Sequence, residues 1–333
     1  MHIKSLLIIL ALSSTLCFEP EHSKESYIFA KFQEFIEVHN KQYSTIEEYM
    51  ARFKIFQNNY NKVEVMQISS EDTPSFNLGV SKFSDMTTQE FRNTYLNLRV
   101  SVKDLVRASS ELSFLETEAA PASYDWRSQG AVGPVKDQGA CGSCWAFSAV
   151  GNLEGLNYIK SKEFLTFSEQ QLVDCDKVDQ GCNGGLMENA FDYLRQNGGI
   201  ELSKDYPYTG RGGKCKFNKS KSALKVKGFQ MVGQDEEQIK QKLFSTGPLS
   251  VALNADNLQF YNNGILDLTA DACDPQAINH GVTLVGYGTQ KGKDFWIVRN
   301  SWGSNWGEDG YFRIARGKST CGINSYVVTA ELE

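Results

Sequence analysis

Hydrophobic and polar residues follow a helical period over the first third of the chain. One apolar stripe recurs at intervals of four, three, four and three residues: Tyr49, Phe53, Phe56, Tyr60 and Val63. That spacing places the five side chains on one face of a helix. On another face Glu48 and Arg52 stand one turn apart, where we expect them to pair. The segment from residue 21 to about 118 contains no cysteine and is expected to be mainly helical.

A capping box predicts the start of a further helix. The Thr87 hydroxyl can accept a hydrogen bond from the N–H of Glu90, while the Glu90 carboxylate accepts one from the N–H of Thr87. Met86 and Phe91 occupy the two positions of a hydrophobic staple around this box. A helix is therefore expected to begin just after Thr87.

The helical pattern then gives way to a second kind of sequence. Between Ser101 and Ala120 no period is sustained, so we expect an exposed, cleavable linker. All five tryptophans of the chain follow this stretch. The change predicts a second folding unit of just over two hundred residues, beginning at about Ala120.

This second unit has helical patterns first and strand patterns last. A buried helix is expected over residues 144–159, directly after a glycine-containing turn. A second capping box, Ser168 to Gln171, predicts a short helix that leads into Cys175. The later segments are rich in β-branched and aromatic residues and predict antiparallel strands: 249–253, 281–288, 294–300 and 310–316. The order indicates an α+β fold.

The N-terminus has the features of a secretory signal peptide. Lys4 precedes an apolar run, Leu6 to Leu12, and small and polar residues follow, so residues 1–17 are expected to be removed. The run is too short for a membrane span, which needs about 20 apolar residues. The net charge of −6 argues against a nucleic-acid partner, which requires concentrated positive charge.

Cysteine usage points to one unpaired thiol. Secretion places the chain in an oxidising compartment, where the seven cysteines that follow Cys17 are expected to form disulfides. Seven is odd, so one thiol remains. The other six allow fifteen pairings, among which spacing alone does not choose.

His280 is the only histidine of the second unit. The strands 281–288 and 294–300 should form a hairpin around Gln290, with residues equidistant from the turn facing each other. This places His280 beside Asn300, whose carbonyl oxygen can accept the imidazole N–H and fix the ring. A lone histidine is more often structural, so this proximity is what favours a catalytic base.

A thiol nucleophile would complete the arrangement. Cys144 stands at the N-terminus of its expected helix, where free N–H groups and an imidazolium such as that of His280 stabilise a thiolate. The Cys144 N–H and the Gln138 side-chain amide could stabilise the oxyanion formed by attack on a carbonyl.

Several ordered motifs of the chain resemble those of one family. Residues 138–145, QGACGSCW, match the nucleophile motif of papain and the cathepsins, and further matches lie at 181–185, 279–281 and 300–307. The resemblance is to papain-family cysteine peptidases, in particular cathepsin L- and F-like precursors with an inhibitory prosegment. It spans nearly the whole chain.

The resemblance implies roles for individual residues. Gln138, Cys144, His280 and Asn300 take the oxyanion-binding, nucleophile, base and orienting roles, and Trp302 shields the hydrogen bond between His280 and Asn300. It also implies a two-lobe fold, with a helical left lobe, an antiparallel, β-barrel-like right lobe and a cleft between them. The implied disulfides join Cys141 with Cys182, Cys175 with Cys215, and Cys273 with Cys321. No cofactor or metal is implied.

Substrate-binding residues follow from the same resemblance. Gly184 and Gly185 would offer backbone hydrogen bonds to an extended peptide. One apolar pocket would dominate side-chain selection, lined by Leu186, Met187, Ala252, Ile278, Gly281 and Tyr326, with Trp302 nearby. This lining contains no acid, so we expect a preference for Leu, Val or aromatic residues over Arg.

The segment before the peptidase resembles an inhibitory prosegment. The helix pattern retains Glu48, Arg52, Phe56 and Asn59, whereas Val63 and Gln67 replace the usual Ile and Asn. The stretch from Gly79 to Asp85 has Ser81 in place of Asn. We expect a signal peptide at 1–17, an inhibitory pro-region at 18–119 and a mature peptidase at 120–333. Acid is expected to protonate carboxylates such as Asp85 and Glu48 and to allow cleavage near Ala119 or Ala120.

Two other classes of protein were weighed. Cys141 and Cys144 form a C-x-x-C pattern, as in thioredoxin-like oxidoreductases or half a zinc site, but no βαβ context, second C-x-x-C or His pair accompanies it. A catalytically silent binding protein would lack Cys144, His280 or Gln138. We therefore expect a monomeric cysteine endopeptidase acting on proteins and peptides, in a lysosome-like vesicle or outside the cell. Asn218 is the one glycosylation sequon.

Overall fold

The computed structural model describes residues 20–68, 75–110 and 119–333. The expected signal peptide, residues 1–17, lies outside this part of the chain. Across the described ranges, no helix is long and apolar enough to cross a membrane. Below, "N-terminal segment" means residues 20–68 and 75–110, and "C-terminal unit" means residues 119–333.

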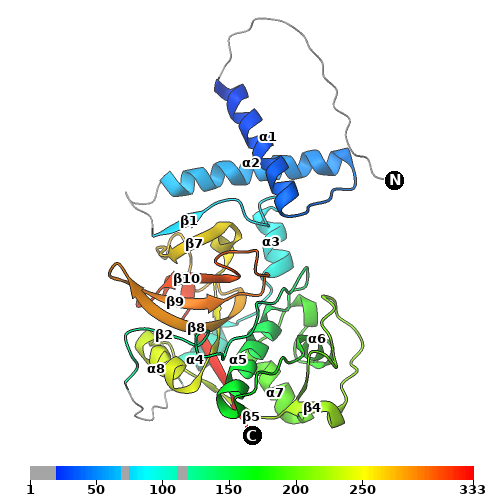
Figure 1. The fold of residues 1–333 in the computed structure, drawn as a ribbon, viewed down its shortest axis with the longest axis vertical. Coiled ribbons are helices and arrows are strands. Elements are labelled where there is room, and N and C mark those ends of the chain that lie inside the picture. Colours follow the sequence, from blue (N-terminus) through cyan, green and yellow to red (C-terminus); the bar gives the residue numbers. More distant parts are fainter. Residues whose placement is uncertain (1–19, 69–74, 111–118) are drawn as a thin grey trace, which may run out of the picture.

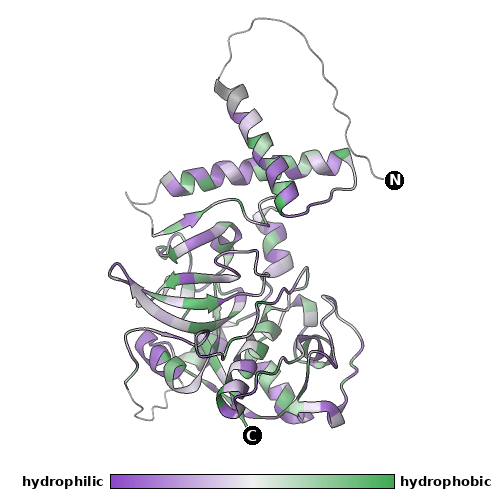
Figure 2. Ribbon diagram, viewed as in Figure 1, coloured by the Kyte–Doolittle hydropathy of each residue, from purple (hydrophilic) through white to green (hydrophobic). Residues whose placement is uncertain are grey.

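The N-terminal segment is mainly helical, as expected. It contains, in order, α1 (Pro20–Val38), α2 (Ile46–Ile68), β1 (Phe76–Leu78), α3 (Thr88–Tyr95) and α4 (Val102–Ser110). Helices α1 and α2 cross above the rest of the molecule (Figure 1), and apolar and polar residues alternate along α2 (Figure 2). Aromatic rings hold the crossing together, among them Phe32, Phe35, Phe53 and Phe56.

Arg52 does not pair with Glu48, so that expectation was wrong. The Glu48 carboxylate instead accepts a hydrogen bond from the backbone N–H of Ser44 at 2.7 Å, just before α2. The Arg52 guanidinium reaches across to α3 and binds the Glu90 carboxylate at 3.0 Å and the Asp85 carbonyl at 3.0 Å. A long-range partner therefore replaces the local one, and it joins two helices.

Around α3 and α4 the structure confirms one prediction and corrects another. The capping box between Thr87 and Glu90 is formed as predicted, and α3 begins at Thr88. The linker expected between Ser101 and Ala120 is, in contrast, partly helical, since α4 spans Val102–Ser110. Ser101 and Asp104 cap this helix reciprocally.

The left lobe of the C-terminal unit is built on a buried helix. Helix α5 (Cys144–Ser161) begins at the cysteine singled out above and is buried over most of its length. Around it lie α6 (Glu169–Cys175), which Ser168 caps through the N–H of Gln171, and α7 (Met187–Asn197). Shorter elements complete this lobe: η1 (Gly181–Asn183), β3 (Ile200–Glu201), η2 (Lys219–Lys221) and β4 (Ser222–Leu224). The short strand β2 (Tyr124–Asp125) belongs instead to the sheet of the right lobe.

The right lobe is a strongly bent sheet. Within the described residues nine strands join, in the order β1-β7-β10-β9-β8-β6-β11-β5, with β2 beside β8. All pairings are antiparallel except β10 with β7, which is parallel and so departs from the expected pattern. The elements are β5 (Val226–Met231), α8 (Glu236–Thr246), β6 (Leu249–Leu253), η3 (Asp256–Phe260), β7 (Tyr261–Leu266), β8 (His280–Gln290), β9 (Lys293–Arg299), β10 (Tyr311–Ala315), η4 (Thr320–Gly322) and β11 (Tyr326–Leu332).

The hairpin of β8 and β9 has a different register from the one expected. Gln290 faces Lys293 across a turn that contains Gly292 at φ 76°, a left-handed conformation that suits such tight hairpin turns. Thr283 faces Arg299, so Asn300 follows the paired part of β9 and does not stand opposite His280. Their side chains meet nonetheless, as described below.

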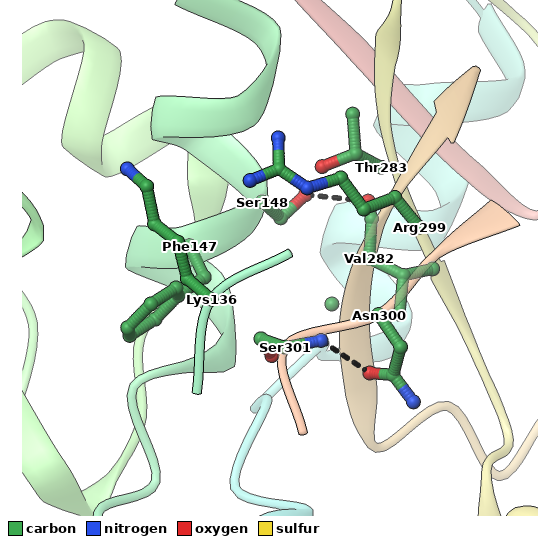
Figure 3. A pocket seen from close by; sticks show the side chains of 9 residues that line it. Lys136, Phe147, Ser148, Val282, Thr283, Arg299, Asn300 and Ser301 are labelled. Atoms are coloured by element: carbon green, nitrogen blue, oxygen red, sulfur yellow. Dashed lines mark hydrogen bonds between the residues drawn. The ribbon is translucent and has the colours of Figure 1, made fainter. Parts of the chain in front are cut away.

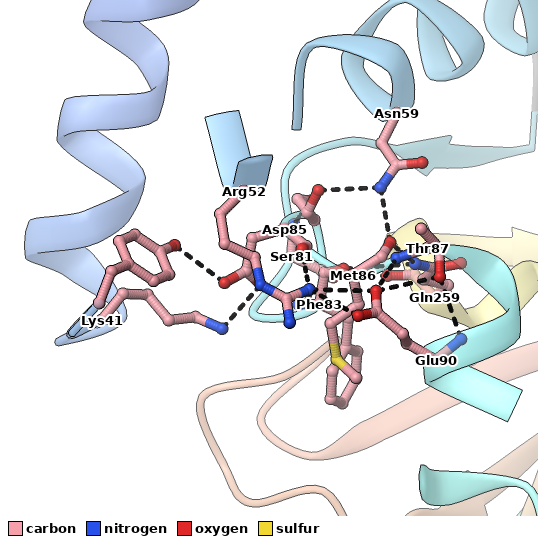
Figure 4. A network of polar contacts seen from close by, with 12 residues as sticks. Lys41, Arg52, Asn59, Ser81, Phe83, Asp85, Met86, Thr87, Glu90 and Gln259 are labelled. Carbon is pink, nitrogen blue, oxygen red and sulfur yellow. Dashed lines mark hydrogen bonds and ion pairs between the residues drawn. The ribbon is translucent and has the colours of Figure 1, made fainter. Parts of the chain in front are cut away.

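The N-terminal segment docks on the right lobe through a polar network (Figure 4). The Gln259 side chain of the C-terminal unit donates through Nε2 to the backbone carbonyl of Met86 at 2.9 Å. The backbone carbonyl of Gln259 accepts a hydrogen bond from the Ser81 hydroxyl at 2.5 Å. Asn59 of α2 donates to the carbonyls of Ser84 and Met86. Asp85 accepts from Lys41 at 2.8 Å. The loop from Ser81 to Met86 is thereby fixed between α2 and the C-terminal unit.

Candidate active site

His280 and Asn300 form the centre of the site. The imidazole Nε2 lies 2.8 Å from Asn300 Oδ1, and both residues are buried. Asn300 Oδ1 also accepts from the N–H of Ser301 at 2.8 Å, which fixes the amide orientation. The Trp302 indole stacks on the imidazole at 4.7 Å between ring centroids and is fully buried. The imidazole is therefore held in one orientation, with water kept from the hydrogen bond.

Cys144 is buried at the first position of α5 and is the free cysteine of the described residues. Burial raises the pKa of its thiol to about 11, against the opposing effect of backbone groups of Gly281 and Asn97. Burial also lowers the pKa of His280 to about 4, despite its hydrogen bond to Asn300. Burial therefore favours the neutral form of both groups in this state and opposes the thiolate and imidazolium expected from the sequence.

Gln138 is positioned by the segment that contains Asn300. The Ser301 hydroxyl donates to Gln138 Oε1 at 2.7 Å, and the backbone N–H of Gln138 donates to the Ser301 carbonyl at 2.8 Å. This leaves Nε2 to donate to the carbonyls of Cys141 at 2.9 Å and Tyr95 at 3.3 Å. The amide donor is therefore oriented by the right lobe and is partly satisfied by the N-terminal segment.

The N-terminal segment runs through the site directly after α3. Besides the contact of Tyr95 with Gln138, the N–H of Leu98 donates to the Asn279 carbonyl, the residue before His280. Asn97 lies so close to Gly184 that a Cβ at that glycine, whose φ is 111°, would collide with the Asn97 carbonyl oxygen. The chain thus covers both walls of the expected cleft.

Three disulfides surround this region. They join Cys141 with Cys182, Cys175 with Cys215, and Cys273 with Cys321, the pairs that the family resemblance implies. Because Cys141 bonds to Cys182, the C-x-x-C pattern does not form a redox pair. In the described part of the chain, no group of three or more His, Cys, Asp or Glu side chains could hold a metal ion.

Strand register brings the expected pocket residues together. Tyr326 of β11 faces Ala252 of β6, which in turn faces Gly281 of β8. Met187 lies against Gly281 and completes the contact with α7. Leu186 and Ile278 belong to the same buried apolar cluster, as do Leu98 and Ala108 of the N-terminal segment. The pocket is therefore filled from within the chain.

The sequence patterns missed an acid beside this pocket. Glu188 follows Met187 at the start of α7 and is buried, and it binds Arg107 of α4. Its carboxylate is close enough to Tyr326 to add to the effect of burial in raising the pKa of that phenol. A buried charge therefore stands next to Tyr326, one of the expected pocket residues. No local pattern marks it, because only the meeting of α7 with β11 brings Glu188 to this place.

A small cavity of about 10 Å³ lies behind the site, between α5 and the strands β8 and β9 (Figure 3). Asn300 and Ser301 border it on one side and Lys136 and Arg299 on another. The Lys136 ammonium there pairs with Glu154 at 2.6 Å and with a second carboxylate of α6. The cavity can hold about one water molecule, so it is not the substrate site.

Comparisons with known proteins identify the family. Residues 120–331 match the model of the papain family cysteine protease, and residues 32–91 match that of the cathepsin propeptide inhibitor domain. Cysteine proteinase 15A of Pisum sativum is 45% identical over 314 residues, which cover 90% of this chain and 85% of that protein. Cysteine proteinase 1 of Dictyostelium discoideum is 40% identical over 319 residues, 90% of this chain and 92% of that protein.

Solved precursor structures are similar along nearly their whole length. The digestive procathepsin L2 proteinase from Tenebrio molitor larval midgut matches with a TM-score of 0.84 at 35% identity, covering 92% of this chain and 100% of that one. The recombinant stem bromelain precursor matches with a TM-score of 0.80 at 35% identity, covering 92% and 99% of the two chains. The chain belongs to the papain family of cysteine proteases and carries an inhibitor domain of the cathepsin propeptide type before its protease domain.

Proposed function

We propose that Cys144 is the nucleophile and His280 the base of a cysteine endopeptidase. In the mature enzyme the Cys144 thiolate attacks the scissile carbonyl carbon and forms a C–S bond. Gln138 Nε2 and the Cys144 N–H stabilise the oxyanion. The His280 imidazolium then donates its proton to the leaving amine as the C–N bond breaks. Asn300 keeps the imidazole oriented throughout.

The second half of the reaction regenerates the enzyme. A water molecule donates a proton to His280 and attacks the thioester carbon, and the C–S bond breaks to release a carboxylic acid. The observation that carries this proposal is that one free cysteine at a helix N-terminus lies against Gly281, the neighbour of an imidazole held at 2.8 Å by an asparagine amide. These are the groups that acyl transfer through a thiol requires.

We propose that the N-terminal segment also keeps the precursor inactive. Its residues Tyr95 to Leu98 lie over the cleft and block access to Cys144 and His280, whose burial favours their neutral forms. Removing this segment would admit water and let the thiolate and imidazolium form. We place the pro-region at 18–119 and the mature enzyme at 120–333, with a signal peptide at 1–17.

Acid is the proposed trigger for maturation. The ion pairs that support the loop before α3 join Lys41 to Asp85 and Arg52 to Glu90. Protonation of these carboxylates would weaken both pairs. Glu48, expected from the sequence to take part, accepts a hydrogen bond from the backbone N–H of Ser44, whereas Glu90 binds Arg52, so we give this role to Glu90. Ala120 is held by Gln241, so cleavage is expected just before it.

The proposed substrates are proteins and extended peptides. Gly184 and Gly185 would bind the peptide backbone, and the pocket of Met187, Ala252 and Tyr326 would take an apolar side chain two residues before the cut. The proposed setting is the secretory pathway, either a lysosome-like vesicle or the outside of the cell. The proposed assembly is a monomer.

The test uses the acid-matured enzyme and a fluorogenic peptide with Leu or Phe two residues before the cut. Cleavage by the wild type should be blocked by a thiol alkylator and lost in Cys144→Ser. Ser148→Ala on the next turn of α5 serves as the matched control and should remain sensitive to the alkylator. A folded, matured wild type that cleaves none of a broad peptide panel would sink the assignment.

A further inference from the structure

One ion pair links the N-terminal segment to the substrate pocket. The Arg107 guanidinium of α4 binds the Glu188 carboxylate of α7. The Glu188 side chain is only 5% exposed, whereas that of Arg107 is 42% exposed. In the precursor a largely exposed guanidinium therefore meets a buried carboxylate.

The pair lies where the substrate side chain is expected. Glu188 is close to Tyr326, and Tyr326 faces Ala252 across neighbouring strands. Ala108, next to Arg107, belongs to the same buried cluster as these pocket residues. Helix α4 thus packs a small apolar residue against this cluster and places a basic one at the adjoining carboxylate.

Glu188 Oε2 and Tyr326 Oη are both buried, and the Tyr326 hydroxyl is near enough to the carboxylate to donate to it. Removal of the N-terminal segment takes away Arg107. The Glu188 carboxylate then loses its cation, and a basic group from outside would restore the ion pair. The mature pocket is therefore prepared for a cation.

We propose that Glu188 is a specificity-determining residue of the mature enzyme, which receives a basic side chain of the substrate in the place left by Arg107. This inference rests on the proposed function. The aliphatic stem of an arginine would lie along Met187 and Ala252, and its guanidinium would donate to Glu188. The planar, multiply donating head suits a carboxylate better than a lysine ammonium does. The pocket would then accept Arg as well as Leu, contrary to the preference expected from the sequence.

The experiment compares peptides that differ in one side chain. Mature wild-type enzyme is given three fluorogenic peptides with Leu, Arg or citrulline two residues before the cut. Citrulline has the shape of arginine without its charge, so the ratio of kcat/KM for Arg over citrulline isolates the charge. We expect a ratio of about 10 or more in the wild type, since a charge-assisted hydrogen bond is roughly twice as strong as a neutral one.

Two variants then test whether the Glu188 carboxylate is responsible for the preference for Arg over citrulline. In Glu188→Gln the ratio should fall to near one, and in the surface control Glu163→Gln it should stay at the wild-type value. A wild-type ratio near one, or an unchanged ratio in Glu188→Gln, overturns the inference. If Glu188→Gln does not fold, a wild-type ratio near one still overturns the inference. Failure of the wild type on the Leu peptide as well would sink the proposed function itself, which separates the two failures.

Discussion

The imidazole Nε2 of His280 lies 2.8 Å from the side-chain oxygen of Asn300. This contact uses one ring nitrogen and leaves Nδ1 without a hydrogen-bond partner among the described residues, although it is buried. In the proposed mechanism, Nδ1 is the nitrogen that exchanges a proton with the nucleophile. The amide would then determine both the direction of the ring and which nitrogen reacts.

Removing the amide should impair the base rather than the fold. In Asn300→Ala the imidazole can rotate and change tautomer, so we expect kcat/KM of the mature enzyme to fall at least about tenfold. Asn300→Asp, which keeps an acceptor oxygen, should retain more activity and shift the alkaline limb of the pH profile upward, because a carboxylate stabilises the imidazolium. Equal kcat/KM in Asn300→Ala and wild type would contradict this role.

Latency should depend on the ionisation of Glu90. Partial burial alone would raise the pKa of this carboxyl, but hydrogen bonds from Thr87 and the charge of Arg52 outweigh it and lower the pKa. The stability that Glu90 confers is therefore present above its ordinary pKa and is lost as the pH falls through the lowered value. We expect Glu90→Gln to mature faster than wild type near pH 7 and to show a weaker acceleration by acid.

The measurement is the half-time of precursor conversion on a gel at several pH values. Glu34→Gln is the matched control, since Glu34 pairs with Lys31 on the exposed surface of α1. The control should follow the wild-type curve. A Glu90→Gln curve that coincides with that of Glu34→Gln would exclude Glu90 from the trigger.

The partly buried ammonium of Lys136 should be important for stability. It pairs with Glu154 at 2.6 Å and Glu169 at 2.5 Å, and both carboxylates are almost fully buried. Lys136→Met would leave two buried carboxylates without their main cation, which typically costs about 3 to 5 kcal/mol. Denaturant unfolding of the precursor should show this loss, whereas the exposed control Lys204→Met should change it by less than about 0.5 kcal/mol. A small loss of unfolding free energy in Lys136→Met would mean that water solvates the two remaining carboxylates.

Ionisation of Asp179 should make the folded enzyme less stable at neutral pH than at acid pH. Burial, with the nearby charge of Asp176, raises its pKa from 3.8 to about 7, while hydrogen bonds from Asn189 and the N–H of Leu186 oppose the rise. Its stabilising contribution is complete below the ordinary value and is lost as the pH rises through about 7. We expect Asp179→Asn to prolong the half-life of the mature enzyme at neutral pH by about threefold or more.

The reason is that an asparagine there keeps the acceptor oxygen and gives Asp176 a donor at every pH. Residual activity is measured after incubation at acid and at neutral pH, with the exposed Asp192→Asn as control. The control should lose activity at neutral pH as the wild type does. Asp179→Asn that decays equally fast would show that another group governs neutral inactivation.

The sequence predicted the elements better than their mutual register. The capping box at Thr87 and the helix that starts at Cys144 depend on neighbours within one turn, and both are formed. The hairpin that carries His280 was expected, but a bulge between Leu284 and Gly286 shifts its pairing. Local spacing does not reveal an extra residue in one strand, because the bulge depends on the neighbouring strands.

Other errors arose where a distant partner outweighs a local one. Arg52 binds Glu90 instead of Glu48, since the fold brings two helix ends together. Helix α4 was missed although Ser101 and Asp104 carry a capping signal that could have been used. The sequence of α4 is also amphipathic, so its helical period was a second signal within the segment expected to be a linker.

Strand β1 of the N-terminal segment closes one edge of the main sheet by pairing with β7. When that segment is removed, the outer N–H and C=O groups of β7 lose their partners and face solvent. An open edge of this kind can add a strand from another molecule. The shortness of β7 and the left-handed Gly264, at φ 94°, limit such addition but do not abolish it. Removal of the N-terminal segment therefore also exposes a strand edge that favours self-association. We expect the precursor to aggregate less than the mature enzyme at the same concentration.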